Sequence, residues 1–252
     1  MLKKGSVGLE VEKWQAFLRG MDVYSEVIVN GIFDETTEME TKAFQIVQGL
    51  KADGIVGNAT FAAAEKFNYS EKKDSNWPQN PGIKNLSFID RQKMFGSFPY
   101  ISAPVPGNPE AIKITTDWAQ KNITTVVIPQ LIGVVGAVST GSVQVNTKIA
   151  NQTVALFHAW EDAGLSNKIL TWGGSWVPRF IRGSRTSLSN HAWGTAFDIN
   201  AQWNGLGVKP AAIGQKGCVR ELVEIAAQFG FYWGGWFPNR PDGMHFEAYK
   251  IV

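Results

Sequence analysis

The segments SNHAWGTAFDIN (residues 189–200) and DGMHFE (residues 242–247) are the most informative part of this 252-residue chain. Together they hold two of its three histidines, and each of these two lies within seven residues of an aspartate. Two histidines and one carboxylate can bind zinc and leave one coordination position for water. A second carboxylate that does not bind the metal can act as a base. The two segments therefore predict a metal site that performs hydrolysis.

The local sequence places these side chains on turns and strands. Residues 196–199 (AFDI) are apolar apart from Asp198 and are typical of a strand that enters a core. His191 then lies on the turn before this strand, so His191 and Asp198 can face one site. His245 is expected on a final strand, and the RPDG turn before it places Asp242 on a bend that can direct its carboxylate toward the same site.

The overall composition limits the class of protein. Hydrophobic residues make up 44% of the chain, which is enough for the cores of one large domain or two unequal ones. Lys and Arg exceed Asp and Glu by only two, 24 against 22. This balance argues against a dedicated nucleic-acid-binding protein and suits contact with an acidic polymer such as a bacterial wall. The single cysteine, Cys218, excludes a disulfide framework, and we expect it to be buried.

Two further stretches bear on localisation. The start, MLKKGSVGLEVEKW, has no apolar core of signal-peptide length. The most apolar run, Val126–Val138, is interrupted by Pro129 and Gln130 and is too short to span a bilayer. We therefore expect a protein without stable membrane association that remains in the cytoplasm after synthesis until another protein releases it.

The first 67 residues have their own pattern. Apolar residues recur at helical spacing, as at Val11 and Trp14. Two similar units, GIFDETT (residues 31–37) and DGIVGNAT (residues 53–60), each join a glycine-containing turn to a threonine, which we interpret as a helix cap. Residues 1–67 are therefore predicted to form a bundle of three short helices.

A change of composition marks the domain boundary. Residues 68–85 are charged and then rich in Pro, Asn and Gly, which indicates a linker. Residues 86–252 mix short β-rich runs with amphipathic helices in no regular βαβ order, which favours an α+β domain with a mostly antiparallel sheet flanked by helices. The strands include 123–129 and 141–146, and the helices include 147–163 and 219–230.

The N-terminal pattern resembles the small peptidoglycan-binding domain found beside many wall hydrolases. The resemblance covers residues 2–66 and implies that this part binds the bacterial wall. Its landmarks are Gly5, Gly8, Val11, Gln15, Leu18, Gly31, Phe33, Thr37, Phe44, Gln45, Leu50, Asp53, Gly54, Val56, Gly57 and Thr60.

The C-terminal segments also resemble a known family. SNHAWGTAFDIN is similar to the S-x-H-x-x-G-x-A-x-D signature of zinc peptidases that include VanY-like D-alanyl-D-alanine carboxypeptidases and phage L-alanyl-D-glutamate endopeptidases. GFYWGGWFPNRPDGMHFE resembles the closing segment of that family. The resemblance implies that His191, Asp198 and His245 are zinc ligands and that Asp242 is the general base.

One residue distinguishes the branches of this family. The carboxypeptidases tend to have Glu three residues before the last histidine, whereas this chain has Asp242, as the endopeptidases tend to. The resemblance thus favours cleavage of the L-alanyl-D-glutamate bond. Trp236 departs from the pattern, because an acidic residue commonly follows the paired glycines in the endopeptidases. We expect Trp236 to line the peptide groove.

Other polar residues are assigned by the same reasoning. The family keeps an arginine upstream of its signature to stabilise the oxyanion, and Arg179 is the predicted residue, with Arg182 as its rival. Ser189 is predicted to contact substrate or to fix the ligand turn, although a plain turn-forming serine fits equally well. His158 lies in a helix among core-spaced apolar residues and is expected to be structural.

The sequence therefore predicts a monomeric phage endolysin, a zinc peptidase that cleaves peptidoglycan stems and is held in the host cytoplasm until lysis. Two alternatives stay open: a D-alanyl-D-alanine carboxypeptidase, and a non-catalytic wall-binding virion protein. The two parts are expected to work independently: removing residues 1–67 should weaken wall binding and leave activity on a soluble peptide unchanged, and loss of both would mean that the two parts are one folding unit.

Overall fold

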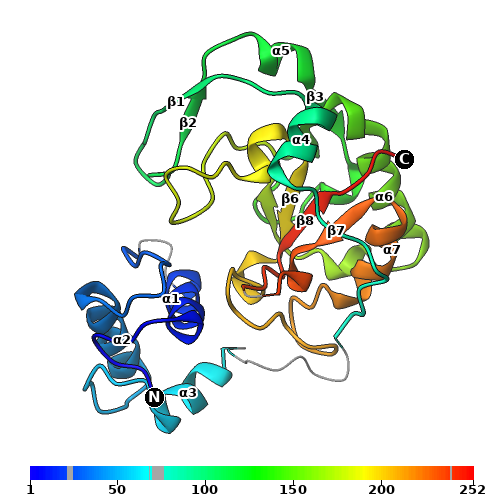
Figure 1. The fold of residues 1–252 in the computed structure, drawn as a ribbon. Coiled ribbons are helices and arrows are strands. Elements are labelled where there is room, and N and C mark those ends of the chain that lie inside the picture. The colour runs from blue at the N-terminus through cyan, green and yellow to red at the C-terminus, as the bar shows by residue number, and fades with distance from the viewer. Residues whose placement is uncertain (22–24, 68, 70–76, 239) are drawn as a thin grey trace.

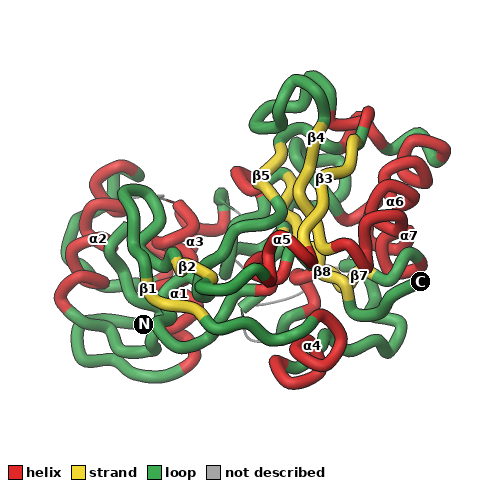
Figure 2. Tube along the Cα trace, turned by 90° about the horizontal axis from the view of Figure 1, so that it is seen from above, coloured by secondary structure: helices red, strands yellow, loops and turns green. Residues whose placement is uncertain are grey.

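The protein is α+β and has two hydrophobic cores (Figure 1). The computed structural model describes residues 1–21, 25–67, 69, 77–238 and 240–252. Residues 2–69 supply all but one member of the smaller core, and the larger core is built from residues between Trp77 and Ala248. Figures 1 and 2 both show the N-terminal helices on one side of the molecule and helices α6 and α7 on the other.

The N-terminal part contains the three predicted helices. They are α1 (Leu9–Met21), α2 (Glu35–Val47) and α3 (Asn58–Glu65). Their core is aromatic: the ring of Trp14 lies 5.1 Å from Phe17 and meets Phe44 edge-on at 5.7 Å. The three-helix prediction is confirmed.

The repeat seen in the sequence corresponds to a repeated hydrogen-bond clamp. Gln15, which is buried, donates through Nε2 to the carbonyl of Ile32 at 2.8 Å and to the hydroxyl of Thr37 at 3.0 Å. Its Oε1 accepts from the amide of Gly31 at 2.9 Å. The interpretation of Thr37 as a helix cap was wrong, because the carboxylate of Asp34 caps α2 and leaves Thr37 inside the first turn.

The second unit repeats the clamp with Gln45. Its Nε2 donates to the carbonyl of Ile55 and to the hydroxyl of Thr60, both at 3.0 Å, and its Oε1 accepts from Gly54 at 2.9 Å. Gly57 occupies the N-cap of α3, so Thr60 is again an internal partner and not a cap. Glutamine and threonine recur because together they satisfy the buried polar groups of each turn.

The C-terminal part contains short antiparallel strands and four helices. Strands β5, β6, β8 and β7 form a four-stranded sheet in that order, and β1–β2 and β3–β4 form two separate pairs. The predicted antiparallel arrangement is confirmed. The elements are α4 (Phe88–Phe95), β1 (Tyr100–Ser102), β2 (Ile112–Ile114), α5 (Trp118–Asn122), β3 (Ile123–Val127), β4 (Ser142–Asn146), α6 (Ala150–Asp162), β5 (Trp172–Gly174), β6 (Ala196–Ile199), α7 (Val223–Gln228), β7 (Phe231–Trp233) and β8 (His245–Ala248).

The four-stranded sheet has one apolar and one polar face. Phe197 of β6 and Phe246 of β8 stack 5.5 Å apart and pack on Phe157 and Trp160 of α6. Side chains alternate along a strand, so the residues on either side of each phenylalanine point to the opposite face. Asp198 lies directly across from His245 in the ladder, which places two of the predicted metal ligands side by side.

Several smaller predictions can also be compared with the structure. Cys218 is buried and His158 is exposed on α6, as expected. Of the predicted linker, residues 68 and 70–76 lie outside the described part, Tyr69 packs in the bundle core and Trp77 packs in the larger core. Among the described residues, none of the helices is both long and apolar enough to cross a bilayer.

Candidate metal centre and substrate cavity

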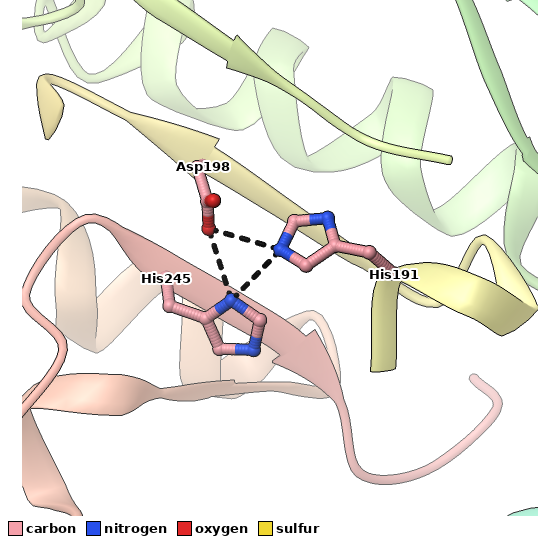
Figure 3. Close-up of side chains that lie close together, drawn as sticks. All are labelled: His191, Asp198 and His245. Atoms are coloured by element: carbon pink, nitrogen blue, oxygen red, sulfur yellow. Dashed lines mark hydrogen bonds and ion pairs between the residues drawn. The ribbon is translucent and has the colours of Figure 1, made fainter. Parts of the chain in front are cut away.

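Three side chains converge on one point at the polar face of the sheet (Figure 3). His191 Nε2 lies 3.2 Å from Asp198 Oδ1 and 3.2 Å from His245 Nδ1, and His245 Nδ1 lies 2.9 Å from Asp198 Oδ1. All three residues are buried. Within the described chain, this is the group of His, Cys, Asp and Glu whose arrangement suits a metal ion.

A tight turn brings His191 to the strand ligands. His191 belongs to the short 3-10 helix Asn190–Trp193, which ends at Gly194 in the left-handed conformation with φ of 66°. A side chain at Gly194 would also meet the backbone of Asn146 at 3.0 Å. Glycine is therefore required here, and the chain can reverse into β6 within two residues of the 3-10 helix.

Each imidazole also makes a hydrogen bond through the ring nitrogen that points away from Asp198, and this bond determines which nitrogen carries the proton. His191 Nδ1 lies 2.6 Å from the carbonyl oxygen of Ser175, which only accepts, so Nδ1 carries the proton. His245 Nε2 lies 3.1 Å from the carboxylate of Glu247 and donates to it. In the neutral rings, both remaining nitrogens then direct lone pairs at Asp198, which is the arrangement of a metal-binding histidine pair.

The spacing of the donor atoms fits zinc. Tetrahedral zinc with bonds of about 2.0–2.2 Å separates its ligand atoms by about 3.3–3.6 Å, close to the 2.9–3.2 Å found here. Two imidazoles and one carboxylate are also the ligand types that zinc prefers.

Glu247 is a functional candidate that the sequence reasoning missed. Its side chain is 0% exposed and accepts from His245, from the Asn190 amide and from Arg91, whose Nη2 lies 3.2 Å away. Arg91 of α4 is only 1% exposed and also donates to Thr195 at 2.8 Å. Glu247 lies two residues after His245 and therefore on the same face of the strand, and this spacing could have indicated it. No sequence pattern indicated Arg91, because it is 156 residues from Glu247 in the chain.

The charges of the centre depend on these contacts. Burial lowers the pKa of His191. Burial also opposes protonation of His245, but the hydrogen bonds that its ring donates to the carboxylates of Asp198 and Glu247 outweigh burial and raise the His245 pKa to about 10. Burial likewise opposes ionisation of Asp198, yet both imidazoles hold its pKa well below the usual range. The centre therefore keeps Asp198 ionised and ready to bind a cation.

Asp242 lies in the same cavity as the three candidate ligands. Its Oδ1 is buried and makes no hydrogen bond with any described residue. Burial raises its pKa to about 7, so it can gain and lose a proton near neutral pH. Gly234 permits this placement, since a side chain there would overlap the Asp242 carbonyl and lie 3.0 Å from the Cβ of His245.

The cavity beside the centre has a volume of about 440 Å³ and contains three arginines. Arg179 donates to the carbonyl of Phe180 at 3.1 Å, whereas Arg182 pairs with Glu110 at 2.9 Å. Arg240, which the sequence reasoning did not single out, makes no hydrogen bond or ion pair with the described residues. Within the described part of the chain, no ion pair holds Arg179 away from the cavity, whereas Arg182 is paired with Glu110.

The remaining two predicted residues lie in different places. Ser189 is buried at the wall of the cavity, and its backbone amide donates to the carbonyl of Arg179 at 3.0 Å. Trp236 is 6% exposed, packs against Trp233 and donates through its indole to the carbonyl of Pro78. Trp236 does not line the cavity, so its placement favours a core residue over the predicted groove residue.

Comparison with known families agrees with the two resemblances. Residues 182–248 match a family model described as D-alanyl-D-alanine carboxypeptidase, and residues 7–64 match one described as a putative peptidoglycan binding domain. A search among curated proteins finds no match to the chain. Residues 182–248 are thus similar to a family described as D-alanyl-D-alanine carboxypeptidase and residues 7–64 to a peptidoglycan-binding domain, a combination that supports a peptidase acting on peptidoglycan.

Proposed function

We propose that this chain is a zinc peptidase that cleaves the L-alanyl-D-glutamate bond of peptidoglycan stems. In this proposal His191, Asp198 and His245 hold the metal and Asp242 is the general base. One observation carries the proposal: two imidazole lone pairs and a carboxylate oxygen converge in a cavity that also contains a buried carboxylate without a hydrogen-bond partner among the described residues. The peptidoglycan-binding match indicates the substrate class.

The residues of the cavity divide the chemistry between them. Zinc at this site would supply a water of lowered pKa and polarise the scissile carbonyl. Asp242 accepts the proton of the attacking water and returns it to the leaving amine. Arg179 lies in the same cavity and stabilises the negative charge that develops on the carbonyl oxygen.

Arg240 is the proposed partner of a substrate carboxylate. Cleavage of the L-alanyl-D-glutamate bond frees the amine of D-glutamate, and cleavage of the D-alanyl-D-alanine bond frees the amine of the terminal D-alanine. In both cases the carbon that carries this amine also carries a carboxylate. Arg240 lines the cavity two residues before the proposed base, and the carboxylates of Asp242 and Glu12 attract its guanidinium without forming a hydrogen bond or ion pair with it. A guanidinium in this position can bind such a carboxylate through two parallel hydrogen bonds. This contact is compatible with cleavage of either bond and does not distinguish the two activities.

The choice of bond depends on Asp242. The aspartate three residues before the last histidine is typical of the endopeptidase branch, whereas the matching family model is described as a carboxypeptidase. Carboxypeptidase activity is therefore the second candidate. Digestion of purified peptidoglycan followed by mass spectrometry separates the two. We expect new L-alanine carboxyl ends; release of free D-alanine without such ends would establish the carboxypeptidase instead.

We further propose that the protein acts as a monomeric phage endolysin. The pairing of a wall-binding domain with a peptidase supports this role, since lysis requires both targeting and cutting. Cells that express the chain should remain intact until a membrane-permeabilising agent is added, and then lyse. Lysis without permeabilisation would contradict the proposed release step.

A further inference from the structure

The N-terminal helix α1 is in direct contact with the catalytic part of the chain. Val208, from the loop after β6, is buried in the core of the N-terminal bundle. A side chain at Gly207 would overlap the Cβ of Ala16, and one at Gly20 would lie 3.3 Å from the carbonyl oxygen of Leu206. Two glycines thus allow the helix and the loop to approach at backbone distance.

The same loop also holds the turn that carries Asp242. The amide of Gly207 donates to the carbonyl of Pro241 at 2.7 Å, and Leu206 forms an isolated β-bridge with Asp242. Leu206 also lines the substrate cavity. The loop therefore contacts the bundle on one side and the proposed general base on the other.

An ion pair joins the two parts at a second point. Arg19 of α1 lies 2.6 Å from Oε1 of Glu110, whose side chain is only 4% exposed. The other oxygen of Glu110 pairs with Arg182 at 2.9 Å, and the amide of Gly183 donates to Oε1 at 3.1 Å. Such an occluded, multiply bonded carboxylate holds its partners more firmly than an exposed surface pair does.

From these contacts we infer that the wall-binding bundle is a positioning element of the active site. Helix α1 braces residues 206–208, and these hold Asp242 at the distance from the metal ligands that proton transfer needs. The inference rests on the proposed role of Asp242. It contradicts the expectation that the two parts work independently, because displacing α1 then impairs catalysis even on a soluble peptide.

The test compares two glycine variants of the full-length chain. Gly207→Ala introduces a methyl group that overlaps Ala16, whereas Gly214 has a similar φ, 88° against 80°, and has no atom within 4 Å of an added methyl. Both variants place an alanine at a left-handed φ and so strain the backbone, but only the methyl group at residue 207 meets α1. On a soluble stem peptide, kcat of Gly207→Ala should fall about tenfold or more, since ångström-scale misplacement of a catalytic group can cost about a hundredfold. KM, zinc content and wall sedimentation should not change.

A milder pair of variants covers the case in which Gly207→Ala fails to fold. Arg19→Ala removes the contact with Glu110, and its control, Lys13→Ala, removes an ion pair that α1 makes with its own Glu10. Only Arg19→Ala should lower kcat, and Arg19→Lys should restore it in part. Equal kcat for each variant and its control would overturn the inference.

Hydrogen exchange distinguishes failure of the inference from failure of the proposed function. The amides of Gly207 and Met244 join the loop region to the turn, since they donate to the carbonyls of Pro241 and Asn204, and the amide of Asp242 within the turn donates to the carbonyl of Gly234. They should exchange faster in Gly207→Ala than in Gly214→Ala. If the unaltered chain cleaves no peptide, the proposed function fails, while unchanged exchange rates would show independently that α1 does not brace the turn.

Discussion

The metal centre and the contact between α1 and residues 206–208 are held together in different ways. Each imidazole of the centre has a fixed hydrogen-bond partner on its far side, Ser175 for His191 and Glu247 for His245. The interface depends on close backbone approach and one ion pair between side chains. Loss of one ligand should therefore abolish function, whereas changes at the interface should reduce it by degrees.

The largest effect is expected from His191→Ala. The variant removes one of three metal ligands, so the site should lose its metal and the protein should lose wall-degrading activity completely. Metal content by atomic spectroscopy and turbidity of a wall suspension measure both effects. His158→Ala is the matched control, because His158 is exposed on α6, where its side chain is hydrogen-bonded to Gln130 and paired with Glu161. Retention of metal by His191→Ala would break the proposed ligand set.

Glu247→Gln should weaken metal binding by about 10–100-fold, as changes to the partners of metal ligands do. The amide no longer balances the buried guanidinium of Arg91, so stability should also fall by about 3–5 kcal/mol. Zinc affinity by chelator competition and urea unfolding measure the two effects separately. Unchanged zinc affinity would show that Glu247 supports the fold and not the centre.

Arg240→Ala should raise KM for a soluble stem peptide by about tenfold or more, because a charge-assisted hydrogen bond is worth about 1.5–3 kcal/mol. The effect should shrink when the carboxylate of the leaving residue is amidated. Arg185→Ala serves as the control, since Arg185 is exposed and donates only to the carbonyl of Pro109. An equal rise in KM for both peptides would exclude the carboxylate contact.

The smallest effect is expected from Glu110→Gln, and it should depend on pH. Burial raises the Glu110 pKa, but Gly183, Arg182 and Arg19 outweigh it and lower the pKa below its ordinary value of 4.5. A carboxylate with a depressed pKa stabilises the fold fully above that ordinary value and loses this contribution as pH falls through the folded pKa. The unaltered chain should therefore exceed the variant in urea resistance at pH 7, and the difference should shrink as the pH falls below 4.5 and through the folded pKa. A constant difference would contradict this role.

The two regions also differ in how far the sequence could predict them. His191, Asp198 and His245 lie in two short segments with strand and turn signals, so their convergence followed from local patterns. Arg91 and Arg19 are joined to their partners only by tertiary packing, which periodicity does not encode. Trp236 shows the same limit, because its indole donates to the carbonyl of Pro78, which is 158 residues away in the sequence.

The prediction that the threonines of the N-terminal repeat are helix caps was wrong for a related reason. Thr37 and Thr60 follow turns at cap-like spacing, so sequence alone favoured helix caps. In the structure, the hydroxyl of each threonine accepts a hydrogen bond from a glutamine of the preceding helix. The repeat was visible in sequence, but the partner of each threonine was not, because 22 and 15 residues separate the pairs.

Replacement of Asp242 by Ala tests the central claim most directly. Asp242 lies in the cavity but is not one of the three converging ligands, so the variant should keep its zinc. Its rate of wall digestion, followed by mass spectrometry of the released peptides, should fall by about 10²–10⁴-fold, the usual contribution of a general base. Full zinc content with collapsed digestion is the predicted result. Digestion at the unaltered rate would contradict the assignment of Asp242 as the base.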